Sequence, residues 1–182
     1  MKINNKNLSI LNMYQSNIFH TSKAYFKLYN FFVTNSLIDP ESFSYRTLKT
    51  YGWSSEKVEG ELKKKLDELE VFNNIICAKS SSDVYTKCEE VNMSYNKIGL
   101  GKEQAVVQKD SNKYSIYYVL YAKVRDALSH GNFRIQKNKK DVYMFIAEDY
   151  SSQGNLNARM VVKVKTLTDI VDIVDRNNII KY

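Results

Sequence analysis

The chain has 182 residues, which is long enough for one domain with a sizeable hydrophobic core. Hydrophobic residues make up 43% of it and only one proline and six glycines occur, so the composition excludes a disordered or low-complexity protein and favours helix. The net charge of +7 fits a polyanionic partner such as nucleic acid, and it fits equally a basic protein whose charge only keeps it soluble.

The first half of the chain is predicted to be helical. Apolar residues recur at helical spacing over 8–33, which predicts one long amphipathic helix. Asp-Pro-Glu at 39–41 is typical of a helix start and predicts a short helix to residue 48. Further helices are expected over about 54–78 and, from a capping box at 80–83, toward residue 97. The segment 102–110 fits no single pattern.

A more apolar helix is predicted from Tyr114 to its end at Gly131. Its apolar positions 114, 117, 118, 121, 124 and 128 fall on one helical stripe. Neighbouring apolar residues widen this stripe until the helix is apolar nearly all round. Such a helix is expected at the centre of a bundle or in a subunit interface.

The pattern after Gly131 changes to a period of about two residues. Two or three short antiparallel strands are expected near 133–135, 142–146 and 160–164, and a lysine-rich turn joins the first two segments. Thr166 is expected to cap a closing helix. The sequence thus predicts a mainly α fold in a single domain over 1–182, with a helical bundle over about 8–132, a β-hairpin or small sheet over about 133–165 and a closing helix over about 167–177.

The two cysteines, Cys77 and Cys88, have no histidine near them at zinc-finger spacing. They are therefore expected to be reduced and to contribute to packing in a cytoplasmic protein. The N-terminal residues lack the apolar segment of a signal peptide, and no apolar run approaches the length of a membrane span. No membrane association is expected.

The run Arg125-Asp126-Ala127-Leu128-Ser129-His130, followed by Gly131-Asn132, is the main candidate for a functional site. It places a permanently charged guanidinium near an imidazole that titrates close to neutral pH. In a regular helix, however, positions five apart point about 140° away from each other. Arg125 and His130 can therefore act on one group only if Gly131 ends the helix in a distorted last turn, or if they meet a substrate or a second copy across an interface.

Asp126 and His130 lie four positions apart and share a helix face. A carboxylate there would hold the imidazole in one tautomer and favour its protonated form, as acid–base catalysis requires. The alternative is purely structural, because a histidine near a helix C-terminus is stabilised by the helix dipole and an acidic residue one turn earlier forms an ordinary pair with it.

The turn after the first strand carries three lysines, Lys137, Lys139 and Lys140. They are candidate ligand-binding residues, because ammonium groups bind phosphates. Lysines in hairpin turns also serve solubility, and the sequence leaves both interpretations open.

The run from Arg125 to Gly131, at the end of a long hydrophobic helix, resembles the Arg-x4-6-His motif of the HEPN superfamily (higher eukaryotes and prokaryotes nucleotide-binding domains). A polar residue directly after the arginine is typical of that motif, and Asp126 supplies it. The segment 114–175 is also similar to bacterial abortive-infection members, in which His-Gly leads into a β-hairpin and a closing helix. The resemblance is specific over 123–133 and only architectural over 1–110.

This resemblance implies a helical-bundle endoribonuclease, usually a homodimer, that acts as a toxin or as a phage-defence effector and has an antitoxin or defence-system partner. Arg125 and His130 become the catalytic pair, Asp126 is their polar neighbour, and Asn132 is placed with the lysines among the substrate-binding residues. Asn132 stands where one toxin subgroup has a tyrosine, so regulation by adenylylation of that tyrosine is not expected. Some HEPN domains keep the fold without nuclease activity.

The residue types fit RNA cleavage, because RNA carries its own nucleophile in the 2′-hydroxyl group. His130 would transfer a proton and Arg125 would stabilise the phosphorane. No Asp/Glu/His cluster has metal-ligand spacing, so neither a metal nor another cofactor is expected. Two further hypotheses stay open, a catalytically inactive module that binds RNA or a protein partner, and a helical structural or regulatory protein.

Overall fold

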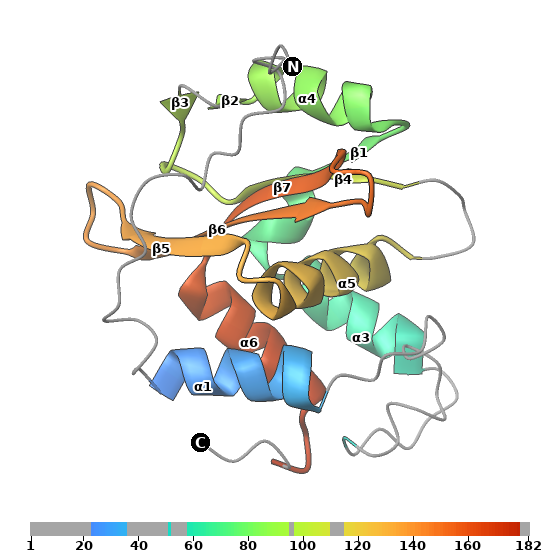
Figure 1. The fold of residues 1–182 in the computed structure, drawn as a ribbon. Helices are drawn as coiled ribbons and strands as arrows, with labels where there is room; N and C mark the ends of the chain where they lie inside the picture. Colours follow the sequence, from blue (N-terminus) through green and yellow to red (C-terminus); the bar gives the residue numbers. More distant parts are fainter. Residues whose placement is uncertain (1–22, 36–50, 52–57, 95–96, 110–114, 179–182) are drawn as a thin grey trace.

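The computed structural model describes residues 23–35, 51, 58–94, 97–109 and 115–178 (Figure 1). Its helical elements are α1 (Lys23–Tyr29), the π-helical turn η3 (Asn30–Thr34), α3 (Val58–Asp67), the 3-10 turn η5 (Glu70–Asn74), α4 (Ser81–Glu90), α5 (Ile116–Ser129) and α6 (Val164–Val174). Its strands are β1 (Ile75–Ala78), β2 (Met93–Ser94), β3 (Lys97–Ile98), β4 (Gln104–Gln108), β5 (Phe133–Lys137), β6 (Tyr143–Tyr150) and β7 (Leu156–Lys163).

The centre of the molecule is a five-stranded mixed sheet with the order β1-β4-β7-β6-β5. β1 and β4 are parallel and are connected through α4, whereas β4 pairs antiparallel with β7, and β5, β6 and β7 form an antiparallel meander. Figure 1 shows α4 above this sheet and α1, α3, α5 and α6 below it. The prediction of a mainly α fold with a helical bundle is therefore wrong, because the structure is a mixed α/β fold.

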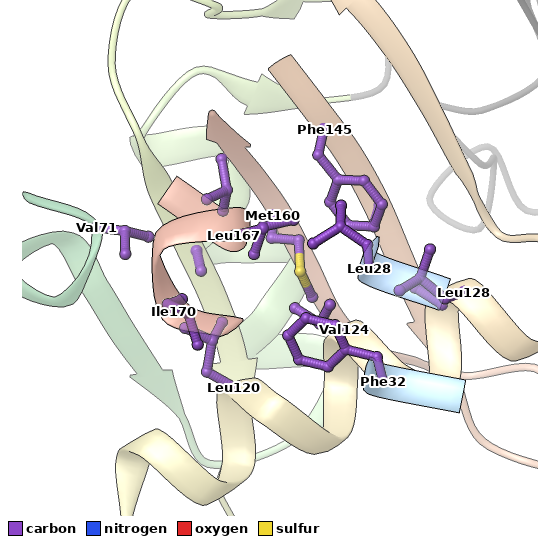
Figure 2. Packing of buried hydrophobic residues seen from close by; sticks show 14 of the residues in the cluster. Leu28, Phe32, Val71, Leu120, Val124, Leu128, Phe145, Met160, Leu167 and Ile170 are labelled. Atoms are coloured by element: carbon purple, nitrogen blue, oxygen red, sulfur yellow. The ribbon is translucent and has the colours of Figure 1, made fainter. Parts of the chain in front are cut away.

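Apolar side chains fill both faces of the sheet. The larger cluster lies between the sheet and the four helices below it, and its residues from β6, β7, α5 and α6 interdigitate with Leu28 and Phe32 from the first helical segment (Figure 2). The smaller cluster lies on the opposite face, where Val84 and Cys88 of α4 cover Val106 and Val161. Burial on both faces explains why the central strands lack alternating polar residues.

The first half differs most from the sequence prediction. The helix expected over about 54–78 is α3, which ends at Asp67, and it is followed by η5 and strand β1. The helix begun by the capping box is α4, in which Ser80 accepts a hydrogen bond from the backbone N–H of Asp83, but α4 ends at Glu90. The ambiguous segment forms β4. The helix predicted over 39–48 and residues 8–22 of the first helix lie outside the described residues.

The second half follows the prediction more closely. Helix α5 and three antiparallel strands overlap the segments predicted for them, although β6 continues to Tyr150 and β7 begins already at Leu156. The closing helix begins earlier than expected, because its N-cap is Lys163, whereas Thr166 is buried inside α6. No described helix has both the length and the apolar character needed to cross a bilayer.

The apolar face of α5 is buried within one chain. Val119, Leu120, Val124, Ala127 and Leu128 are buried, and α5 packs on β6 and η3. The apolar character of α5 is explained by this intramolecular packing and requires no second copy. A homodimer through α5 remains a prediction, but it would have to use the exposed flank of the helix.

Candidate functional site

The C-terminus of α5 has the geometry that its sequence favours. Gly131 adopts a left-handed conformation with φ of 69°, which confirms its expected role in ending the helix. The backbone N–H of Asn132 donates to the carbonyl oxygen of Ala127 at 2.8 Å, and that of Gly131 donates to Leu128 at 3.4 Å. These two bonds form a Schellman motif, so the position of His130 is fixed by backbone hydrogen bonds rather than by its side chain.

The side chain of His130 is exposed at this helix end. Its backbone N–H donates to the carbonyl oxygen of Asp126 at 3.0 Å, but its imidazole makes no hydrogen bond or ion pair with a described residue. An imidazole in this setting is open to solvent and to a ligand on the side of the molecule where α5 leads into β5 (Figure 1).

Asp126 binds Arg125 and not His130. Both Nε and Nη2 of Arg125 donate to Oδ1 of Asp126, the first at 2.9 Å, and both side chains are partly buried. The expected contact between the Asp126 carboxylate and the imidazole is absent from the described structure. Helix α5 ends at Ser129, and His130 is its C-cap with φ of −94° and ψ of −1°, so the regular-helix angle of about 140° between positions five apart does not apply strictly to Arg125 and His130.

The sequence does not predict a second ion pair on α5. Lys123 Nζ donates to Oδ2 of Asp149 at 2.8 Å, and the Asp149 side chain is only 6% exposed. Lys123 lies on α5 and Asp149 on β6, so the pair ties the helix to the sheet. No local sequence signal joins residues from two elements this far apart, because the contact depends on tertiary packing.

Asn132 connects the helix end to the sheet through its backbone. Its carbonyl oxygen accepts a hydrogen bond from the N–H of Glu148 at 3.0 Å, one residue before β5 pairs with β6. The ring of Phe133 then stacks between Tyr25 of α1 and Phe145 of β6. The backbone of Asn132 thus attaches the helix end to the sheet, and its side chain is partly exposed. The predicted substrate-binding role of this side chain stays a prediction.

The three lysines lie at the tip of the β5–β6 hairpin, away from His130. Lys137 is an ordered surface cation, because its ammonium group forms an ion pair with Asp141 at 2.7 Å and lies 4.9 Å from the centroid of the Tyr143 ring. The hydrogen bond to Asp141 raises the pKa of Lys137 above its usual value. Lys139 and Lys140 are exposed, and neither side chain pairs with a described residue.

The distance between His130 and the hairpin lysines follows from strand geometry. β5 runs from Phe133 to Lys137, and four residues at about 3.3 Å each place its ends roughly 13 Å apart. His130 and the hairpin lysines therefore do not converge on one phosphate. They can contact one extended strand at separate positions.

A buried charge network lies on the face of the sheet covered by α4. Nε and Nη2 of Arg159 contact Oε1 of Glu148 at 2.8 Å, and Nη1 donates to the carbonyl oxygen of Met93 at 2.8 Å. Tyr150 donates its hydroxyl proton to the other Glu148 oxygen at 2.7 Å. Both charged side chains are almost fully buried, which favours a structural role for this network.

The described residues contain no group of three or more His, Cys, Asp or Glu side chains that could hold a metal ion. Comparison with protein-family models, with curated proteins and with solved structures returns no match for this chain.

Proposed function

We propose that this chain is a metal-independent endoribonuclease in which His130 transfers a proton and Arg125 binds the reacting phosphate. The observation that supports it most is the exposed imidazole of His130, which the Schellman motif holds at the end of α5 without using the ring. A titratable group in that position can reach a solvent-borne substrate. The order helix, His-Gly, antiparallel strands and closing helix also agrees with the segment on which the HEPN resemblance rests.

The proposed reaction needs few protein groups. The 2′-oxygen of RNA attacks the adjacent phosphorus, its proton leaves to a base, and the bond from phosphorus to the 5′-oxygen breaks as that oxygen gains a proton. The products are a 2′,3′-cyclic phosphate and a 5′-hydroxyl end. His130 performs one of the proton transfers, and the planar guanidinium of Arg125 binds the negative oxygens of the phosphorane.

The helical spacing of Arg125 and His130 favours a catalytic site shared between two protomers. Arg125 and His130 of one chain face different directions, so they act on the same phosphodiester if one comes from each protomer of a homodimer. The contact would involve the exposed flank of α5 near Ser129, since the opposite face is buried in the chain. As in the families that the sequence resembles, the biological role would be that of a toxin or phage-defence effector controlled by a partner.

A second candidate function is an RNA-binding module without catalysis. The Arg125–Asp126 pair favours it, because one carboxylate already occupies the guanidinium that would stabilise the phosphorane. In this case the surface binds RNA phosphates, but His130 transfers no proton in a reaction.

The decisive experiment measures cleavage of single-stranded RNA with and without EDTA. We expect cleavage that survives chelation, leaves a cyclic phosphate and stops when the substrate carries 2′-deoxyribose. His130→Ala should lower the rate about 10²- to 10⁴-fold. His20→Ala is the matched control, because the chain has only two histidines, and it should keep the rate.

Two outcomes would contradict the nuclease proposal. Cleavage that depends on added magnesium would assign the chemistry to a metal instead of His130. Salt-dependent RNA binding by folded protein without any cleavage would establish the second function instead.

A further inference from the structure

We propose that the tip of the β5–β6 hairpin is a preformed binding site for single-stranded RNA, in which Tyr143 stacks on a base and Lys139 and Lys140 bind the flanking phosphates. This inference rests on the proposed function, because it names RNA as the ligand. It adds a place where the RNA is held away from the reacting bond.

The first observation is the rigidity of the turn. The side-chain oxygen of Asn138 accepts hydrogen bonds from the backbone N–H groups of Lys140 at 2.9 Å and Val142 at 3.1 Å. Its amide nitrogen donates to the carbonyl oxygen of Leu100 at 3.2 Å, which attaches the tip to the neighbouring loop. A turn that served only solubility would not need this internal and external fixation.

The second observation is backbone strain at the same place. Asp141 has a φ of 61°, a left-handed conformation that is uncommon for a residue other than glycine. Its N–H donates to the carbonyl oxygen of Asn138 at 3.0 Å. Strained residues of this kind cluster where a structure presents functional groups in a fixed direction. Here the turn presents Lys139 and Lys140, both exposed.

The third observation is an exposed aromatic ring beside these cations. Tyr143 is 48% exposed, and in the described structure only it and Phe26 are large hydrophobic residues with this degree of exposure. The ammonium group of Lys137 lies over the ring and also pairs with Asp141, so Lys137 orients Tyr143 rather than serving as a free phosphate ligand. Exposed rings next to cations are the usual elements of single-stranded nucleic acid sites.

The position of the tip fits a strand that passes His130. β5 is at the edge of the sheet, and its two ends lie roughly 13 Å apart, with the His130 side at one end and Tyr143 at the other. An RNA strand laid along this edge would meet the proposed catalytic group and the stacking ring at different nucleotides. The tip would thus set which phosphodiester reaches His130.

The test is binding of a short 2′-O-methyl oligonucleotide, which has the RNA backbone but lacks the free 2′-hydroxyl needed for cleavage. Fluorescence anisotropy at several salt concentrations gives both affinity and its salt dependence. Replacing Lys139 and Lys140 together by Ala should weaken binding and lower the slope of log affinity against log salt by about 1.4, from about 0.7 for each lost contact. Replacing Lys63 and Lys64 of α3, which are also exposed, removes the same charge and should change the slope little.

The ring is tested separately. Tyr143→Leu should weaken binding about 5- to 100-fold, whereas Tyr143→Phe should bind as the wild type does, because a phenyl ring still stacks. Phe26→Leu is the control for the loss of an exposed ring elsewhere. Thermal unfolding of each variant shows whether its fold is kept.

The other possible results of these binding experiments distinguish failure of the hairpin site from failure of the proposed nuclease function. If the wild type binds RNA but the hairpin variants behave like their controls, the inference is overturned and the proposed nuclease function stands. If only the lysine pair matters, or if polyglutamate competes as well as RNA does, the tip is a general charged surface and the stacking site is wrong. If the wild type neither binds nor cleaves RNA, both proposals fail.

Discussion

The carboxylate of Asp126 accepts two hydrogen bonds from the guanidinium of Arg125, the residue directly before it on α5. The two side chains lie on the partly exposed flank of the helix, so the pair is accessible to a ligand. An RNA phosphate would need the same N–H donors that Asp126 now occupies. If Arg125 binds phosphate as proposed, we therefore expect Asp126 to weaken that binding, whether or not the protein also cleaves RNA.

Asp126→Asn should increase affinity for the 2′-O-methyl oligonucleotide by about 2- to 5-fold, which corresponds to the worth of an exposed ion pair. The amide competes less well than a carboxylate and removes a negative charge near the phosphate. Asp169→Asn, which ends an exposed pair with Lys165 on α6, is the control and should have little effect. A weaker complex with Asp126→Asn would mean that the carboxylate holds Arg125 in its binding orientation.

Gly131 and Gly60 should respond in opposite directions to replacement by alanine. At both positions the added Cβ meets no atom within 4 Å, so packing does not decide the outcome. Gly131 has a positive φ, and Gly131→Ala should lower the free energy of unfolding by about 1–2 kcal/mol. Gly60 lies inside α3, where alanine is preferred, so Gly60→Ala should raise it by about 0.5–1 kcal/mol. Urea denaturation of both variants tests this difference in sign.

Arg159→Met should destabilise the protein by about 3–5 kcal/mol, because it leaves the buried carboxylate of Glu148 without its cation. The double variant Glu148→Leu with Arg159→Met should regain most of that loss, since no unpaired charge remains. Lys165→Met removes an exposed cation and should change stability by less than about 1 kcal/mol. If Arg159→Met also changed stability by less than this, the buried pair would contribute nothing.

The two thiols should differ in reactivity. Cys77 is exposed on the edge strand β1, whereas Cys88 of α4 is fully buried, and burial raises the pKa of Cys88 to about 12. Ellman's reagent at pH 8 should therefore modify one thiol in the native protein and both after unfolding. Cys77→Ser should abolish the native reaction. Rapid modification of a second native thiol would contradict the packing of α4.

The raised pKa of Cys88 also predicts a loss of stability in alkali. In the unfolded chain the thiol ionises near its ordinary value of 9, while in the fold it stays neutral until about pH 12. The contribution of the neutral buried thiol is therefore complete below pH 9 and is lost as the pH rises toward 12. Cys88→Ala should make the free energy of unfolding less dependent on pH over that interval. An unchanged pH dependence would show that another group dominates.

The fold was predictable where structure is local and not where it depends on distant pairing. The period of two over 133–164 identified β5, β6 and β7, and the capping box identified the start of α4. β4 was missed because Ala105, Val106 and Val107 are all buried, so the strand shows no alternation. The sequence does not predict β1, because its four apolar residues follow a charged helical stretch and carry no periodicity of their own.

The candidate site was predictable to the same extent. The left-handed conformation of Gly131 follows from its own chemistry and its position after the apolar stripe. The partner of Asp126 cannot be predicted in this way. Helical spacing allows a contact with His130 four residues later, and side-chain rotamers also allow a contact with the neighbouring Arg125. The Lys123–Asp149 pair needed knowledge of which strand lies over α5.

The pairing of β4 with β7 affects when the chain can fold during its synthesis. Gln104 pairs with Val161, so the two halves of the sheet join only through residues far apart in the chain. Folds with such distant contacts form slowly, and chains leave the ribosome from the N-terminus. His130 is synthesised before β6 and β7, which provide the support for its helix end. A nascent chain thus carries the proposed catalytic residue for some time before it has the sheet that holds it, and activity is expected to appear only once synthesis has passed Lys163.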